Sequence, residues 1–271
     1  MNKREIARKM RLQMQNLALN LGIKKSRADY GRFIILGRSR VGSNLLRSLL
    51  NAHSQIEAYG EIFRNREAMD WDHLNVLQSE KMHQMVLRDP VAFLDEKVFR
   101  KYPVETAAVG FKIFYYHARE GSWEPVWPYL LGQTELRVIH IKRRNILKTH
   151  LSRKRAEITD SWVNTTGAPE KPVSVTLDYE ECLADFVRTR AWEEEADAQF
   201  ADHPLLQLSY EDLAGDYEGE MRRVFDFLDV NYEAVRPSIH KQSRQTLAEA
   251  ITNYDELKRR FFDTPWAEFF E

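Results

Sequence analysis

A glycine-bearing loop joins a short apolar strand to an apolar helix near the start of the chain, and this feature constrains the fold most. Residues 32–36 (RFIIL) have the length and composition of a buried strand. Residues 37–44 (GRSRVGSN) follow directly, and residues 45–50 (LLRSLL) begin a helical pattern of leucines. A strand, a glycine loop and a helix N-terminus in this order direct several backbone N–H groups at one anion. The sequence therefore predicts a phosphate or sulfate site within residues 37–44, and the alternative is a tight turn with solvated arginines.

The loop has the spacing of the nucleoside-triphosphate P-loop, G-x-x-x-x-G-K-[ST], but lacks its two decisive side chains. Gly37 and Gly42 match the glycines, whereas Ser43 replaces the lysine that contacts the β- and γ-phosphates. Asn44 replaces the hydroxyl residue that binds Mg²⁺. Arg40 instead supplies a permanent, forked positive charge beside an anion. These departures disfavour Mg-ATP as the ligand.

Strands alternate with helices along most of the remaining chain. Such alternation predicts an α/β protein with a P-loop-like three-layer fold, in which helices flank a central parallel sheet. Ligands of such sheets bind beyond the carboxyl ends of the strands. The further strands are expected at residues 109–114, 137–141 and 205–209, and the helices at 43–52, 145–155, 178–201, 211–228 and 246–262. Thr246 and Glu249 give the last helix a capping box.

The chain divides into an N-terminal amphipathic basic helix, residues 1–30, and a single domain, residues 31–271. No internal repeat or low-complexity linker interrupts the larger part. The N-terminal helix has a basic face and an apolar face, the latter formed by Ile6, Met10, Met14, Leu17 and Leu21. This pattern suits packing on the domain or on a partner chain, and it also suits peripheral contact with a membrane surface.

Composition excludes several classes of protein. The 40 basic and 41 acidic side chains nearly balance, so the chain lacks the net positive charge by which a dedicated nucleic-acid-binding protein attracts its ligand. Cys182 is the only cysteine, so an internal disulfide is impossible and a reducing compartment is expected. No apolar run approaches the ~20 residues of a membrane span, and no apolar signal-peptide segment follows the basic N-terminus. The sequence predicts a cytoplasmic protein, with or without peripheral membrane contact.

A second anion site is predicted after the strand at residues 137–141. Arg144 follows this strand, and Ser152 lies eight residues later, about two turns into the next helix. A guanidinium and a hydroxyl in this arrangement can converge on one anion. The alternative pairing would start at Arg143 and end on Leu151, which has no polar group. A solvated basic helix face is the other interpretation of this stretch.

Both sites resemble those of sulfotransferases that use 3′-phosphoadenosine 5′-phosphosulfate (PAPS), in particular the bacterial carbohydrate and lipid enzymes of the nodulation-factor type. Their loop reads roughly P-R-S-G-[ST]-T, and residues 39–44 lie over it, with departures at Ser39, Val41 and Asn44. Their R-[ND]-x(6)-S motif matches Arg144, Asn145 and Ser152. Residues 109–114 (VGFKIF) resemble the family's G-F-K strand and are expected to be a fold signature without a catalytic role.

The resemblance implies how PAPS, and its product 3′-phosphoadenosine 5′-phosphate (PAP), would bind. The 3′-phosphate is expected at Arg144 and Ser152, and Lys241 resembles a basic residue that closes over the donor. No metal is required, because a terminal sulfate carries less charge than a terminal phosphate. The 5′-phosphosulfate is expected at the loop and helix N-terminus formed by Arg38, Ser39, Arg40, Val41, Gly42, Ser43 and Asn44.

The resemblance also implies the catalytic residues. Glu61, in a Gly-Glu pair, is the expected base for the acceptor hydroxyl, and Arg40 is expected to stabilise the departing bisphosphate. A partly buried carboxylate serves as a base if its pKa is raised. His53 and His117 are reserve bases. The acceptor would be a small molecule, glycan or glycolipid, and the alternatives are a P-loop kinase of a small metabolite and a non-catalytic nucleotide-binding peripheral protein.

Overall fold

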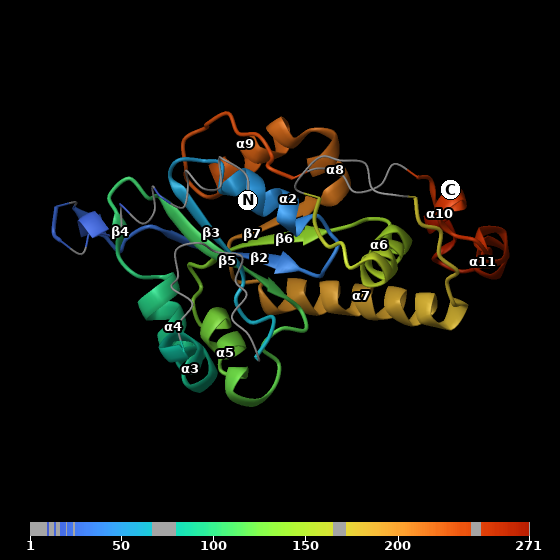
Figure 1. Cartoon of the computed structure of the whole chain (residues 1–271), viewed down its shortest axis with the longest axis horizontal. Helices are drawn as coiled ribbons and strands as arrows, with labels where there is room; N and C mark the ends of the chain where they lie inside the picture. The colour runs from blue at the N-terminus through green and yellow to red at the C-terminus, as the bar shows by residue number, and fades with distance from the viewer. Residues whose placement is uncertain are drawn as a thin grey trace.

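A five-stranded parallel sheet forms the centre of the molecule in the computed structural model, which describes residues 10, 14, 17–19, 21–23, 25–66, 80–164, 172–239 and 245–270 (Figure 1). Its strand order is β3-β5-β2-β6-β7. The strands are β2 (Gly31–Gly37), β3 (Ile56–Glu61), β5 (Ala108–Phe114), β6 (Arg137–Lys142) and β7 (Leu205–Ser209). A separate antiparallel pair joins β1 (Ser26–Arg27) to β4 (Tyr102–Pro103).

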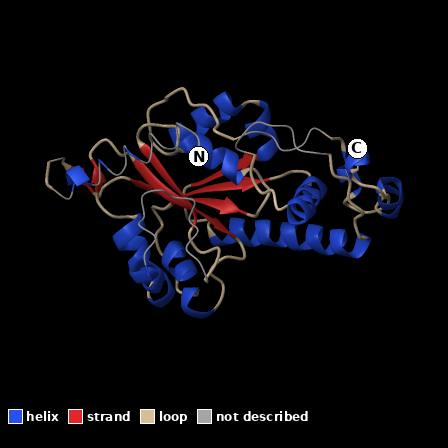
Figure 2. Ribbon diagram, in the orientation of Figure 1, coloured by secondary structure: helices blue, strands red, loops and turns tan. Residues whose placement is uncertain are grey.

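Helices cover both faces of the sheet, so the predicted three-layer α/β fold is confirmed (Figure 2). One face carries α2 (Ser43–Leu50), α8 (Tyr210–Gly215) and α9 (Tyr217–Phe227). The other carries α3 (Glu80–Arg88), α4 (Pro90–Phe93), α5 (Val126–Leu131) and α7 (Tyr179–Gln199). The remaining helices are α6 (Ile146–Thr159), α10 (Leu247–Ala250), α11 (Tyr254–Arg260) and the short turns η1 (Leu94–Val98), η2 (Gly121–Trp123) and η3 (Ala267–Phe269).

Alternation along β2 explains how one strand serves two cores. Ile34 and Leu36 pack with α3, α4 and α5, whereas Phe33 and Ile35 pack with α2 and α9. All four side chains are fully buried, as expected for the central strand of a parallel sheet. A third cluster joins α6, α7, α10 and α11 to the C-terminal aromatic residues.

The structure differs from the sequence prediction in the unpredicted elements β1, β4, α3, α4 and α5, and in three further places. β3 was not predicted, because IEAYGE contains two glutamates and a glycine and lacks the apolar run of the other strands. The helix expected at 211–228 is interrupted at Asp216, whose Oδ1 accepts a hydrogen bond from Gly219 N at 2.9 Å and so begins α9. The helix expected at 246–262 is divided into α10 and α11, although the predicted capping box of Thr246 and Glu249 is confirmed.

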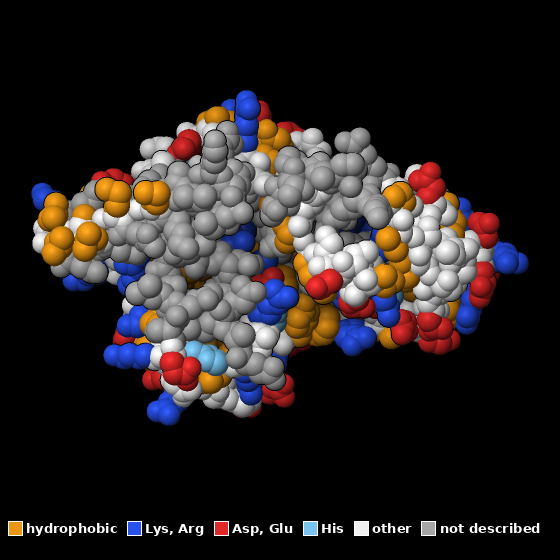
Figure 3. All heavy atoms as spheres, in the orientation of Figure 1, with side chains coloured by type: hydrophobic (Ala, Val, Ile, Leu, Met, Phe, Trp, Pro, Cys, Tyr) orange, Lys and Arg blue, Asp and Glu red, His pale blue; other side chains and the backbone are white. Residues whose placement is uncertain are grey.

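The N-terminal segment is described only in part. Its described residues Met10, Met14 and Leu17 are helical and exposed. In the described part of the chain, no helix has both the length and the apolar character that crossing a bilayer requires. On the face shown in Figure 3, basic and acidic side chains alternate around the described surface, in keeping with the nearly balanced charge.

Candidate active site

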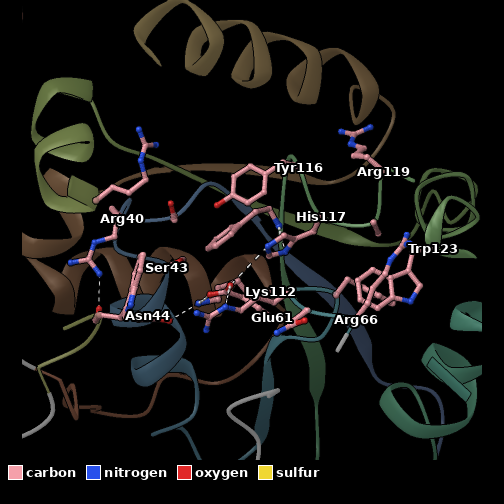
Figure 4. A pocket seen from close by; sticks show the side chains of 18 of the residues that line it. Arg40, Ser43, Asn44, Glu61, Arg66, Lys112, Tyr116, His117, Arg119 and Trp123 are labelled. Carbon is pink, nitrogen blue, oxygen red and sulfur yellow. Dashed lines mark hydrogen bonds and ion pairs between the residues drawn. The ribbon is translucent and has the colours of Figure 1, made fainter. Parts of the chain in front are cut away.

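A cavity of about 790 Å³ opens at the carboxyl ends of β2, β3 and β5. Its described lining comes from the loop after β2, the end of β3, β5 and the turn that follows it, and α6. In Figure 4, Arg40, Ser43 and Asn44 lie at one end and Arg66, Arg119 and Trp123 at the other. Glu61, Lys112 and His117 lie between these groups. The cavity is therefore the place where the predicted anion loop and the predicted base meet.

Backbone geometry in the loop after β2 requires glycine at one position. Gly42 is the N-cap of α2 with φ of 86°, and a Cβ there would lie 2.4 Å from the ring of Tyr210. Gly42 has no side chain to cap the helix, so this position leaves the first N–H groups of α2 to other acceptors. Arg40 also has a positive φ, 71°, which is unfavourable for a residue with a Cβ. The loop thus holds a strained conformation that aims a helix N-terminus at the cavity.

Arg40 links the two predicted anion sites. Its Nε donates a hydrogen bond to Ser152 Oγ at 2.9 Å, and its Nη1 donates to the carbonyl oxygen of Trp162 at 2.6 Å. The backbone oxygen of Arg40 accepts a hydrogen bond from Arg143 Nη1 at 3.2 Å. Arg40 and Ser152 are consequently neighbours in the structure, whereas the sequence predicted Arg144 as the partner of Ser152.

Arg38 lies elsewhere. It is 1% exposed and turns away from the cavity to meet the carboxylate of Asp185 at 3.3 and 3.1 Å, with a further hydrogen bond to Thr189 Oγ1. Arg38 was expected to contact the donor, but in the structure its side chain anchors the loop to α7. Val41 is also buried, in the core beside α2, and only its backbone faces the loop. Ser39, Ser43 and Asn44 line the cavity as expected.

Arg144 departs from the expected arrangement. Its side chain is 62% exposed, and its Nη1 donates hydrogen bonds to the Asp212 carboxylate at 3.0 and 2.9 Å. It does not line the described cavity, so the structure does not bring Arg144 and Ser152 together on one anion. The neighbouring Arg143 reaches the loop instead and stacks on Tyr210, 4.6 Å from the ring centre. Lys241 lies outside the described residues.

Glu61 stands at the centre of the cavity beside a buried lysine. Lys112 Nζ lies 2.8 Å from Glu61 Oε1 and also donates a hydrogen bond to Asn44 Oδ1 (Figure 4). The pairing of β3 with β5 shifts between Tyr59 and Glu61, and this irregularity places Glu61 opposite Lys112. One ammonium group thus joins α2, β3 and β5.

The pKa of Glu61 is shifted in the direction opposite to the expected one. Burial alone would raise its pKa, but the Lys112 ammonium outweighs burial, with smaller contributions from His117 and Arg64. The pKa of the Glu61 carboxyl therefore lies below its usual range, not above it. Glu61 is ionised at neutral pH and is ready to accept a proton.

The two reserve bases differ in position. Burial lowers the pKa of His117 to about 4, and its Nδ1 accepts a hydrogen bond from the Phe114 N–H at 3.3 Å. The proton of the neutral ring is therefore on Nε2, which lies 4.0 Å from Glu61 Oε2. A ring that is protonated on the side facing the cavity has no lone pair there to accept a proton. His53 is 2% exposed, bonds to Asn231 O at 2.9 Å and does not line the described cavity.

The geometry acquires a family context from comparison with known proteins. A profile described as the sulfotransferase family matches residues 32–234, which include the entire described lining of the cavity. The chain belongs to the sulfotransferase family. Similar relatives of this sulfotransferase are nodulation protein H of Rhizobium tropici, 29% identical over 88% of this chain and 92% of the relative, and nodulation protein H of Rhizobium meliloti strain 1021, 27% identical over 88% and 94%. A solved sulfotransferase from Alicyclobacillus acidocaldarius is 16% identical, covers 89% of this chain and 94% of its own, and has a TM-score of 0.45.

Several residues of the sulfotransferase cavity were missed from sequence. Lys112 was assigned to a fold signature, yet it is 1% exposed and contacts Glu61 directly. A signal was available, since a lone charge within an otherwise apolar strand, AVGFKIF, needs a buried partner. Arg153, Arg66 and Arg119 also line the cavity. Arg66 and Arg119 lie in loops, where spacing carries no such signal.

Proposed function

We propose that this sulfotransferase moves a sulfuryl group from PAPS to a hydroxyl of a glycan, a glycolipid or a similar metabolite. The observation that supports this function is the shared cavity, in which an anion-binding loop and an ionised carboxylate face the same space. An ATP-dependent kinase is disfavoured because Ser43 and Asn44 occupy the positions of the P-loop lysine and the Mg²⁺ hydroxyl.

The residues at the loop end of the cavity fit a doubly anionic phosphosulfate. The uncapped N-terminus of α2 offers backbone N–H groups, and Gly42 allows the Tyr210 ring to pack directly against the loop. Arg40 and Arg153 supply guanidinium groups there, and Ser152 supplies a hydroxyl already hydrogen-bonded to Arg40. Arg144 would have to leave Asp212 to contact the 3′-phosphate, and its exposed position permits that movement.

Bound PAPS would supply the sulfuryl group: an acceptor oxygen–sulfur bond forms while the sulfur–oxygen bond to the 5′-phosphate breaks, and its electron pair leaves with the bisphosphate. Glu61 would take the acceptor's proton, since its carboxylate is ionised and faces the cavity. Arg40 would stabilise charge on the departing phosphate, a contribution of about 3–4 kcal/mol for a well-placed donor. Lys112 would hold Glu61 in position.

Lys112 also gives Glu61 a means of becoming a stronger base. The same ammonium contacts Asn44 at the first turn of α2, where the donor anion is proposed to bind. An anion at that helix N-terminus would compete with Glu61 for Lys112. Loss of the lysine contact leaves burial as the dominant influence and raises the pKa of Glu61, which improves proton abstraction when donor is present.

The acceptor class is inferred from the resemblance to bacterial carbohydrate and lipid enzymes, and the cavity has surfaces that suit a sugar. Tyr116 and Trp162 both line it and are 42% and 38% exposed. Exposed aromatic faces provide flat apolar contact for the C–H faces of sugar rings. A glycan hydroxyl presented on these rings would lie in the same cavity as Glu61.

Calorimetric titration with PAP, compared with Mg-ATP, tests the proposed function. We expect PAP to bind and Mg-ATP to bind at least tenfold more weakly, the latter because the loop lacks the P-loop lysine. Binding of PAP should be accompanied by sulfation when labelled PAPS is added with glycan and lipid extracts. Turnover of Mg-ATP without PAP binding would establish the kinase instead. Nucleotide binding with no transfer to any extract would favour the non-catalytic alternative.

A further inference from the structure

Two arginines gather at the end of the cavity that is remote from the donor loop. Arg66 follows β3 and Arg119 follows β5, and both line the cavity beside Trp123. In Figure 4 they lie on the opposite side of Glu61 and Lys112 from Arg40 and Asn44. Their position places them on the side from which an acceptor would approach Glu61.

Both guanidinium groups are held in place by neutral groups. Arg66 Nη2 donates a hydrogen bond to the backbone oxygen of Glu120, and its Cζ lies 5.0 Å from the centre of the Trp123 ring. Arg119 Nε donates to the backbone oxygen of Tyr115 at 2.6 Å, and its Cζ lies 3.7 Å from the centre of the Trp127 ring. These contacts orient the two groups without neutralising them.

No carboxylate of the described residues lies within 4.0 Å of either guanidinium. Burial lowers the pKa of Arg119, and the attraction of Glu195 only partly opposes this effect. A guanidinium that is desolvated and lacks a matched carboxylate is stabilised when an anion binds to it.

The charge of the cavity wall exceeds what the donor requires. Its described lining carries six cationic side chains and two carboxylates, and one of these carboxylates, Glu61, is matched by Lys112. Arg40 and Arg153 lie at the loop end and serve the donor proposed above. Arg64 also lies 3.9 Å from Glu61 Oε2, which leaves Arg66 and Arg119, with Glu120 as the second carboxylate of the described lining, as excess positive charge at the acceptor end.

We propose that Arg66 and Arg119 form an acceptor subsite for an anionic group, so that the hydroxyl compound sulfated here also carries a carboxylate, a phosphate ester or a sulfate ester. The inference rests on the proposed function, because it assigns the remote end of the cavity to the acceptor. Two forked guanidinium groups can each form paired hydrogen bonds with such an anion. The sugar body would lie between this subsite and the donor, next to Glu61.

The test uses protein saturated with PAP, so that the donor site is filled before any second anion is added. Glucose, glucuronic acid, glucose 6-phosphate and glucose 6-sulfate are then titrated separately, and their binding is measured by calorimetry. We expect at least one anionic sugar to bind about tenfold or more tightly than glucose. The three anionic sugars distinguish the carboxylate, phosphate and sulfate sources.

The double variant Arg66→Gln/Arg119→Gln should weaken binding of the preferred anionic sugar by about tenfold or more. Arg223→Gln is the matched control, because Arg223 lies on α9, pairs with Glu220 and is not part of the cavity lining. The double variant should bind PAP with a Kd within about threefold of the wild-type value, which would show that its fold is intact.

Anionic sugars that bind no better than glucose would overturn the subsite, as would unchanged binding in the double variant. Failure of PAP to bind the wild-type protein contradicts the proposed function and removes this inference with it. That result is visible in the first titration, so the two failures are distinguishable.

Discussion

Lys112 is the residue on which the centre of the cavity depends. It lies in the third position from the end of β5, is 1% exposed and contacts groups on β3 and α2. A buried ammonium is costly without partners, and Glu61 and Asn44 supply them. The same contact lowers the pKa of the Glu61 carboxyl. Replacement of Lys112 is therefore expected to change the pKa of Glu61.

Replacement of Lys112 should change the pH dependence of turnover. In Lys112→Met the cation is lost while burial remains, so we expect the pKa of Glu61 to rise. A base must be ionised to act, so the acid limb of the kcat/KM profile for PAPS, which reports the enzyme without bound donor, should move to higher pH. Lys97→Met, which removes an exposed lysine paired with Glu96, is the control and should leave the limb in place. An unmoved limb in Lys112→Met would contradict the pairing.

Replacement of Glu61 should separate chemistry from binding. Glu61→Gln preserves the size of the side chain and removes the base, so the single-turnover rate is expected to fall by about 10²–10⁴-fold. The affinity for PAP should change little, because the proposed donor contacts lie at the loop end of the cavity. Rapid-quench measurement with labelled PAPS checks the rate. A rate equal to wild type would assign the proton to another group.

The strand-loop-helix unit formed by β2 and α2 is the element on which the proposed donor site depends. Its conformation depends on Gly42, whose φ of 86° and closeness to Tyr210 exclude a Cβ. Gly42→Ala should lower the free energy of unfolding by at least about 1–2 kcal/mol. Weaker binding of PAP should accompany this loss, because the N-terminus of α2 would be displaced.

Gly215→Ala is the matched control for this element. Gly215 ends α8, and a Cβ there would meet no atom within 4 Å. We expect a change in unfolding free energy within about 0.5–1 kcal/mol, with PAP binding retained. Urea denaturation and calorimetry of both variants measure the comparison. Equal effects at the two glycines would show that the loop geometry is not required.

Sequence was informative about elements whose pattern is local. The apolar runs predicted four strands of the sheet, and the capping box predicted the start of α10. β3 was missed because its burial depends on neighbours that are distant in sequence, and not on an apolar run. The helix over residues 211–228 was predicted as continuous because the hydrophobic period continues through Asp216, whereas a single capping side chain ends it.

The site was predictable where a backbone motif fixed it and unpredictable where a side chain chose its partner. Arg40, Ser43 and Asn44 line the cavity because the loop geometry allows little else. Arg38 and Arg144 are in the same motifs, yet their long side chains turn to Asp185 and Asp212. Both carboxylates come from helices later in the chain, so spacing alone does not indicate the pairs.

At the scale of the whole molecule, Asp185 connects the loop after β2 to two helices. Its carboxylate, on α7, accepts from Arg38 in the loop after β2 and from Arg153 on α6, and it contacts His150 at 3.1 Å. Burial would raise its pKa, but the His150 hydrogen bond and the charges of Arg38 and Arg153 hold it well below the usual range. One buried carboxylate thus holds together the loop after β2, α6 and α7.

Asp185→Asn should therefore destabilise the protein as a whole. Loss of the carboxylate leaves the buried Arg38 without an anionic partner, which typically costs about 3–5 kcal/mol. Because the native pKa of Asp185 lies below the unfolded one, its stabilisation is present above about pH 4 and is lost as the pH falls further. The free energy of unfolding of the wild-type protein should therefore decrease as the pH falls below about 4. The decrease should be smaller in Asp185→Asn, because the variant has no carboxylate to protonate at this position. Urea denaturation across this range measures both effects.

Asp29→Asn is the corresponding control. Asp29 forms an ion pair with Arg27 but is 84% exposed, so solvent screens the pair and its removal should leave the free energy of unfolding nearly unchanged. A loss at Asp185 no greater than that at Asp29 would contradict the connecting role.

The register shift between Tyr59 and Glu61 has a consequence for how this family can vary. Side chains on a strand alternate between faces, so removal of one residue from the regularly paired part of β3, Ile56 to Tyr59, would put the side chains on one side of the gap on the opposite face. Substitutions within β3 can be absorbed by repacking, but an insertion or a deletion cannot. Members that use this carboxylate are therefore expected to differ in residue identity from Ile56 to Tyr59 while keeping the number of residues in that regularly paired part.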